Sequence, residues 1–380
     1  MESSMGYPDQ AVVERTERRT NAPVALSSIT VRTKKDLEAL RDAWAGTDGN
    51  PKILASTAGC EDLSFSGLDI KCVLRGEESS GRNSVHNIVL APGAEIPAHG
   101  LDHGDAYWVV AGGEVELTIG SKTAVLGNAG FGFAPPHTTQ AVANRSNAPA
   151  EVFVIHLPAG IERGFALAKA KYAESGADTV REAWALLEPL GLKLTDSQPL
   201  ANDDRVNCQQ HRVDRKISTL DDLVALRADW AQLEPIPKLV VDPRECRNIA
   251  AMGQEARLLL SPEESRGAAS AFCNIIHGGV DVPAHHQPTE EETFIILRGD
   301  IRLRIGNQTA ERVSPGAFGF APRFGTHAFT HLGEGESFVF SINTPGGHDR
   351  GFEIGLTEGG KPEFPQIIEA HGFTFHGPGH

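Results

Sequence analysis

Three side chains in the C-terminal half of the sequence have the types and the spacing of metal ligands. His285 and Glu292 lie in the segment PAHHQPTEEETFIILRG, residues 283–299, and His327 follows downstream. Two imidazoles and one carboxylate with open coordination positions suit Fe(II), Mn(II), Ni(II) or Co(II). We therefore expect one divalent transition metal, with Fe(II) as the first candidate, held by His285, Glu292 and His327.

The sequence leaves the fourth ligand open. Gln287 stands two residues after His285, so the alternation of a β-strand places both side chains on one face. The Gln287 amide oxygen could ligate the metal or hydrogen-bond a water there. His286 is the alternative, but it can turn inward only if a β-bulge shifts the register.

Strand alternation also predicts the surroundings of Glu292. If Glu292 points into a barrel, Phe294 and Ile296 do so as well, and Glu291 faces solvent. Large aromatic side chains inside a barrel serve both as core and as walls of a substrate pocket. The residues that we expect in this double role are Phe294, Phe320, Phe329 and Phe340. His331 and His348 are expected at the surface or in loops.

The chain consists of two copies of one unit. The matched segments are DLEALRDAW (36–44) with DLVALRADW (222–230), PAH (97–99) with PAH (283–285), and FGFAP (131–135) with FGFAP (318–322). We place the units at 28–200 and 213–380, with a polar linker near 197–212 and a mobile N-terminal arm at 1–27. A repeat of this length indicates two similar domains.

Each unit predicts a short helix, a strand-rich middle and a terminal helix. The segment 36–44 has Leu37, Leu40 and Trp44 on one face, and Thr219 is the expected N-cap of the matching helix. Alternating apolar residues and Gly-rich turns predict strands in the middle of each unit. The segment 165–189 is rich in helix-forming residues and is expected to be helical.

The order of these residues resembles the cupin superfamily. Its first motif is close to P-x-H-x-H-x4-E-x6-G, in which His285 fills the first histidine place, Glu292 the glutamate place and Gly299 the last place. Pro322 followed by His327 resembles the second motif, P-x4-H. The PGGHDRGFE segment and the terminal HGFTFHGPGH resemble the branch of quercetin 2,3-dioxygenase-like cupins.

This resemblance implies a mainly β protein with two tandem cupin jelly-roll β-barrels and flanking short helices. It also implies a metal-dependent dioxygenase in which Glu292 is both ligand and catalytic base. In the first unit the four ligand places hold His99, Leu101, Ala106 and Gln140, so we expect its metal site to be degenerate. His103, Asp105 and His137 lie near it in sequence, but at displaced positions.

Composition excludes some partners. The net charge is −15, which argues against nucleic acid and anionic membranes as partners. Five cysteines without a CxxC pair predict idle thiols in a reducing, cytoplasmic setting. The first 20 residues lack the apolar core of a secretory signal, and no apolar run is long enough to span a bilayer.

Three functions remain open at this point. The first is a dioxygenase that uses O2 to cleave a hydroxylated aromatic, flavonol-like or enolisable small molecule. The second is a non-oxidative isomerase, cyclase or lyase that uses the metal and Glu292 as a base. The third is a ligand-binding bicupin without catalysis. Turnover that consumes O2 separates the first from the second, and the chain is expected to be a monomer or a homodimer.

Overall fold

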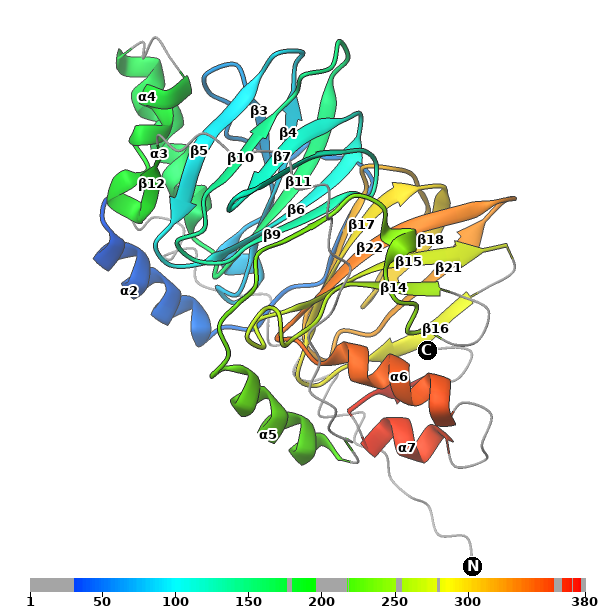
Figure 1. Ribbon diagram of the computed structural model, residues 1–380. Coiled ribbons are helices and arrows are strands. Elements are labelled where there is room, and N and C mark those ends of the chain that lie inside the picture. Colours follow the sequence, from blue (N-terminus) through cyan, green and yellow to red (C-terminus); the bar gives the residue numbers. More distant parts are fainter. Residues whose placement is uncertain are drawn as a thin grey trace, which may run out of the picture.

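The chain folds into two β-barrels that lie side by side (Figure 1). The computed structural model describes residues 31–175, 180–195, 217, 219–250, 255–278, 281–358, 364–370 and 372–376. The expected arm at 1–27 and the expected linker at 197–212 lie outside the described residues. The predicted fold class, mainly β with two tandem jelly rolls, is confirmed.

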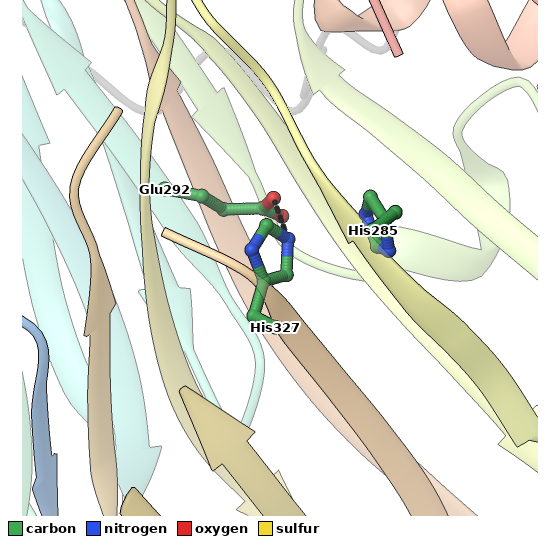
Figure 2. Close-up of side chains that lie close together, drawn as sticks. All are labelled: His285, Glu292 and His327. Atoms are coloured by element: carbon green, nitrogen blue, oxygen red, sulfur yellow. Dashed lines mark ion pairs between the residues drawn. The ribbon is translucent and has the colours of Figure 1, made fainter. Parts of the chain in front are cut away.

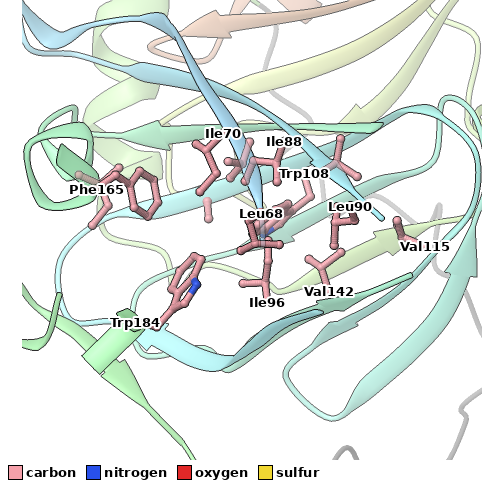
Figure 3. Close-up of a cluster of buried hydrophobic side chains, with 14 of the residues drawn as sticks. Leu68, Ile70, Ile88, Leu90, Ile96, Trp108, Val115, Val142, Phe165 and Trp184 are labelled. Carbon is pink, nitrogen blue, oxygen red and sulfur yellow. The ribbon is translucent and has the colours of Figure 1, made fainter. Parts of the chain in front are cut away.

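The first barrel contains a seven-stranded sheet, ordered β13-β9-β6-β11-β4-β3-β2, and a five-stranded sheet, ordered β12-β5-β10-β7-β8. The strands are β2 (Glu61–Asp62), β3 (Asp69–Leu74), β4 (Ser84–Leu90), β5 (Glu95–Leu101), β6 (Asp105–Gly112), β7 (Val115–Ile119), β8 (Lys122–Leu126), β9 (Phe131–Ala134), β10 (Gln140–Ala143), β11 (Ala150–Leu157), β12 (Leu192–Leu194) and β13 (Lys238–Val240). Its interior is filled by apolar side chains around Ile88, Trp108 and Val142 (Figure 3). This barrel is therefore a packed core.

The second barrel contains a six-stranded sheet, ordered β1-β20-β17-β22-β15-β14, and a five-stranded sheet, ordered β19-β18-β21-β16-β23. The strands are β1 (Lys52–Leu54), β14 (Glu255–Leu260), β15 (Ser270–His277), β16 (Asp281–His286), β17 (Glu291–Arg298), β18 (Asp300–Ile305), β19 (Gln308–Val313), β20 (Phe318–Ala321), β21 (His327–Leu332), β22 (Glu336–Thr344) and β23 (Thr374–Phe375). Phe294 and Ile296 lie in its interior cluster, as the alternation of β17 predicts.

Short helices flank both barrels (Figure 1). They are α2 (Lys34–Ala45), α3 (Ile161–Ser175), α4 (Val180–Ala185), α5 (Leu220–Trp230), α6 (His348–Glu358) and α7 (Phe364–Ala370), with 3-10 turns η2 (Gly76–Glu78), η3 (Glu188–Leu190) and η4 (Pro243–Glu245). Thr219 caps α5 in a capping box with Asp222, which confirms the predicted N-cap. In its described residues, the segment 165–189 that is expected to be helical contains most of α3 and all of α4. In the described part of the chain no helix combines the length and the apolar character needed to cross a membrane.

The first strand of each unit is exchanged between the barrels. Strand β1 pairs with β20 of the second barrel, and β13 pairs with β9 of the first. Each exchanged strand still holds an ion pair to its own unit: Lys52 Nζ lies 2.8 Å from Glu78, and Lys238 Nζ lies 2.7 Å from Glu264. The contiguous ranges 28–200 and 213–380 therefore do not coincide with the sheets.

The two large sheets pack face to face around a common core. Phe131 of the first barrel stacks on Phe340 of the second, with ring centroids 5.9 Å apart. Two reciprocal ion pairs cross the same interface, Arg82–Glu291 at 3.2 Å and Arg266–Asp105 at 3.3 Å. Glu291 is thus buried against the first barrel, and the expectation that it faces solvent is wrong.

The cysteines differ from the expectation of idle thiols in one respect. Cys72 and Cys273 are buried free thiols and Cys60 is a partly buried one, as expected. Cys246, however, is disulfide-bonded. Cys208 lies outside the described residues.

The buried ion pair that anchors β13 provides a test of the strand exchange. We expect Lys238→Met to lower the free energy of unfolding by about 3–5 kcal/mol, because it leaves the carboxylate of Glu264 buried and uncompensated. The matched control is Lys52→Met, whose ion pair with Glu78 is partly exposed and should cost less. Urea titrations of both variants measure the difference, and equal small losses would contradict this account.

Candidate metal centre

His285, Glu292 and His327 converge at one end of the second barrel from three strands (Figure 2). One ligand atom of each lies within 4.8 Å of the others. The Glu292 Oε2 and His327 Nε2 atoms are 3.1 Å apart, and the two imidazole centroids are 4.3 Å apart. All three side chains are buried, so together they form a small, water-poor cluster of donors.

Strand register explains this convergence. His285 of β16 stands directly opposite His327 of β21 in the five-stranded sheet. Glu292 comes from β17 in the facing sheet, where its strand alternation directs it inward beside Phe294. The cluster thus bridges both sheets, and it depends on the barrel being closed.

Two backbone carbonyl groups orient the imidazoles. The Nδ1 atom of His285 lies 2.8 Å from the carbonyl oxygen of Pro283, and Nδ1 of His327 lies 2.9 Å from that of Gly325. A carbonyl only accepts, so Nδ1–H donates in each ring and a neutral imidazole keeps the Nε2 lone pair free. This second contact of a histidine is the usual way in which metal-binding proteins fix the ring.

The atoms that face each other lack a hydrogen-bond partner. Oε2 of Glu292 and Nε2 of His327 are both buried, and at 3.1 Å their geometry does not make a hydrogen bond. A lone pair that faces a carboxylate oxygen at this distance is repulsive, whereas a cation between them would satisfy both. The donor set therefore fits a divalent metal.

The protonation states suit the same conclusion. Burial, with the neighbouring His327, lowers the pKa of His285 to about 3. The carboxyl group of Glu292 is ionised when it binds a cation, because the metal displaces its proton. Near pH 7 the cluster thus offers a neutral imidazole and an ionised carboxylate, the forms in which these groups bind metal.

The structure separates the two candidates for the fourth ligand. His286 points away from the cluster, and its Nδ1 lies 2.8 Å from Nε2 of His376. Gln287 is buried, and its Nε2 lies 3.3 Å from Nδ1 of His348, the first residue of α6. The register shift of β16 lies between Val282 and His285 and does not bring His286 to the cluster, so of the two residues Gln287 is the one beside the site.

His348 is the residue that the sequence reasoning missed. It is buried rather than exposed, as is His331, which contacts Ser337. The repeat contained a signal, because PGGHDRGFE in the second unit matches PAGIERGFA in the first, and His348 takes the place of Ile161. A histidine that replaces an apolar residue only in the unit with the metal ligands points to the site.

A cavity of about 80 Å³ adjoins the cluster. Its walls include His285, Glu292 and His348, and its apolar walls are Val282, Phe329, Phe352, Ile368, Phe373 and Phe375. Of the four phenylalanines expected in the pocket, only Phe329 lines it. Phe294 packs beneath His327, with centroids 5.3 Å apart. Phe320 and Phe340 lie in the core between the barrels, because their strand positions face the other sheet.

The first barrel keeps one histidine in the same orientation, but it lacks the other side chains that could bind a metal. His99 keeps the same contact, with Nδ1 2.8 Å from the carbonyl of Pro97. Gln140, opposite His99, accepts a hydrogen bond of 2.6 Å from Trp108, and Ala106 replaces the glutamate. Among the described residues of this barrel no group of three ligand atoms lies close enough for a metal.

The displaced residues of the first unit do not rebuild a site. The rings of His103 and His137 are 6.5 Å apart, and Asp105 is engaged by Arg266 across the interface. Leu101, at a ligand place, is a buried apolar residue. The degeneracy of the metal site in this barrel stays a prediction.

Comparisons with known proteins support the cupin superfamily. Residues 86–156, in the first barrel, match the family described as Cupin domain. No curated protein sequence matches the chain. The fold resembles oxalate decarboxylase from Bacillus subtilis at pH 4.6, with 15% identity, a TM-score of 0.50, and coverage of 87% of this chain and 89% of that one. A tryptophan-to-tyrosine variant of that enzyme gives 14% identity, a TM-score of 0.50, and coverage of 87% and 90%. The architecture is thus that of a bicupin.

We expect the purified protein to bind about one equivalent of a divalent transition metal in the second barrel. The double variant His285→Ala, His327→Ala should lose it, because only one carboxylate would remain. The matched control is His99→Ala, which removes the corresponding imidazole of the first barrel and should leave the metal content unchanged. Elemental analysis measures all three proteins, and two equivalents in the wild type would overturn this assignment.

Gln287 offers a second test. We expect Gln287→His to tighten metal binding by roughly tenfold, the lower end of what residues around a metal contribute, because it adds an imidazole beside the site. Competition with a chelator measures the change. The neighbouring substitution His286→Gln serves as the control and should have no effect. Unchanged affinity in Gln287→His would mean that this position does not reach the metal.

Proposed function

We propose that this protein is a metal-dependent dioxygenase that acts on a compact, enolisable or hydroxylated substrate in the second barrel. The observation that carries the proposal is the buried set His285, Glu292 and His327 beside a cavity. Two histidines and one carboxylate with open positions are typical of non-haem Fe(II) oxygenases. The resemblance of PGGHDRGFE to quercetin 2,3-dioxygenase-like cupins supports the same class.

In this proposal the two histidines would bind the metal, and Glu292 would also transfer the proton. A divalent metal, with Fe(II) first and Mn, Ni or Co as alternatives, would supply Lewis-acid activation of the substrate oxygen and a place for O2. His285 and His327 would hold it through Nε2, since their Nδ1 atoms are engaged by carbonyls. Glu292, ionised at neutral pH, would take the proton of the substrate hydroxyl or carbon acid.

The size of the cavity bears on the substrate. A volume of about 80 Å³ gives room for roughly five to eight water molecules, at ~10–15 Å³ for each. A compact enolisable compound suits this space better than a polycyclic flavonol. The apolar walls would exclude water from the reacting atoms.

A non-oxidative isomerase or lyase is the second candidate, favoured by His348. This imidazole lines the same cavity as Glu292, and it is held by Gln287. Two groups in one cavity that can carry protons suffice to move a proton between carbon and oxygen of a substrate. The structural neighbours are named oxalate decarboxylases, but at 14–15% identity they support the fold alone.

The test is oxygen uptake by the metal-loaded protein with a panel of small enolisable compounds. We expect turnover to consume O2, and Glu292→Gln to lower kcat by about 10²–10⁴-fold while it lowers metal content less. The matched control is Glu291→Gln, which makes the same substitution one residue away, on the face of β17 that meets Arg82 of the first barrel. Turnover without O2 would favour the second candidate, and equal loss of metal and activity would leave Glu292 as a ligand only.

A further inference from the structure

We propose that the cavity of the second barrel selects ligands that bind with a single negative charge and an apolar remainder, and that it disfavours dianions. Enolates of neutral diketones belong to the favoured class, and small dicarboxylates such as oxalate belong to the other. The inference rests on the proposed function, because it takes a divalent metal to be held by His285, Glu292 and His327.

Charge balance is the first step of the argument. Glu292 is the single carboxylate of the cluster, and backbone carbonyls hold Nδ1–H of both imidazoles, so neutral rings would face the metal through Nε2. With neutral imidazoles and a divalent ion, the centre carries a net charge of about +1. A monoanionic ligand makes it neutral, whereas a dianion leaves a net negative charge in a buried, apolar space, which is costly.

The walls of the cavity provide no compensating cation. None of the described residues that line it is a lysine or an arginine. The nearby arginines are engaged elsewhere: Arg350 pairs with Glu263 and lies over Trp230, and Arg227 pairs with Glu290. A second carboxylate of a ligand would therefore find no charged partner in the cavity.

The polar groups of the cavity suit a neutral oxygen. His348 lies beside Gln287 and packs against Phe352 and Phe373, with centroids 4.9 and 4.6 Å away. If Gln287 donates to Nδ1, the proton of the neutral ring is on Nε2, where it can be donated to a carbonyl. Asn274 is already engaged, since its Nδ2 donates to Ser341 at 3.0 Å. The cavity thus offers one uncharged hydrogen-bond donor, the Nε2–H group of His348, which matches one carbonyl oxygen of a ligand.

The remaining surface is apolar and comes from distant parts of the chain. Phe329 lies on β21, Ile368 on α7, and Phe375 on β23, which pairs with β16 next to His285. These side chains would contact methyl or methylene groups of a ligand. Metal-binding oxygens at one end and hydrocarbon at the other thus define the ligand class.

Calorimetry of the metal-loaded protein without O2 tests the proposal. The probes are acetylacetone and oxalate, each titrated into the Co(II)-loaded protein. We expect acetylacetone to bind at least about tenfold tighter than oxalate, because its enolate carries one negative charge and oxalate carries two. Elemental analysis before and after titration verifies that the metal stays bound.

The outcomes separate this proposal from the function on which it rests. Protein that takes up no metal at His285 and His327 contradicts the proposed function itself. Metal-loaded protein that binds oxalate as tightly as acetylacetone, or binds neither, overturns the ligand class alone.

A charge-adding variant examines the cause of the preference. Ile368→Lys places an amine on α7 at the cavity wall, and we expect the preference to shift toward oxalate by roughly tenfold. The matched control is Ile368→Met, which preserves the apolar wall and should keep the wild-type preference. An unchanged preference in a folded, metal-loaded Ile368→Lys protein would mean that charge does not select the ligand.

Discussion

The pairing of β1 with β20 is the interaction on which the rest of the second barrel depends. Strand β20 lies between β1 and β17, and β17 carries Glu292. The loop after β20 leads to His327. Strand β20 thus lies beside the strand of Glu292 and directly precedes His327 in the chain, and β1 covers its other edge. The first unit thus supplies backbone hydrogen bonds to the sheet that positions the site, and β13 returns the same contact to the first barrel.

The sequence predicted the parts of the structure that follow from local periodicity and from the repeat. The N-cap at Thr219 follows from its residue type. The inward face of β17 and the convergence of His285, Glu292 and His327 follow from strand alternation at known spacing. Alternation fixes which face a side chain takes, but it does not state what covers that face. For this reason the expected places of Glu291, Phe320 and Phe340 are wrong, since the outer face of β17, β20 and β22 meets another sheet rather than solvent or a pocket.

The exchanged strands and His348 could not be predicted for a different physical reason. A three-residue strand carries too little pattern to name its partner, and both β1 and β13 pair across units. His348 reaches the cavity from a helix that is distant in sequence from the ligand motif, so only tertiary packing reveals it. The sequence contained one hint: Ile161 of the first unit stands at the place that matches His348 of the second.

The two barrels keep one frame and differ in chemistry. The carbonyl groups of Pro97 and Pro283 hold their histidines in the same way, although only the second barrel surrounds its histidine with further donors. Strand exchange suggests why the first barrel persists in the chain. Loss of the first unit would remove β1, which pairs with β20, and would expose the apolar face that the two large sheets share. An unpaired strand edge beside an exposed apolar face promotes aggregation. Substitution of the residues at the ligand places of this half leaves the shared sheets in place, whereas deletion of the half would open the second barrel, so the two units are no longer separable.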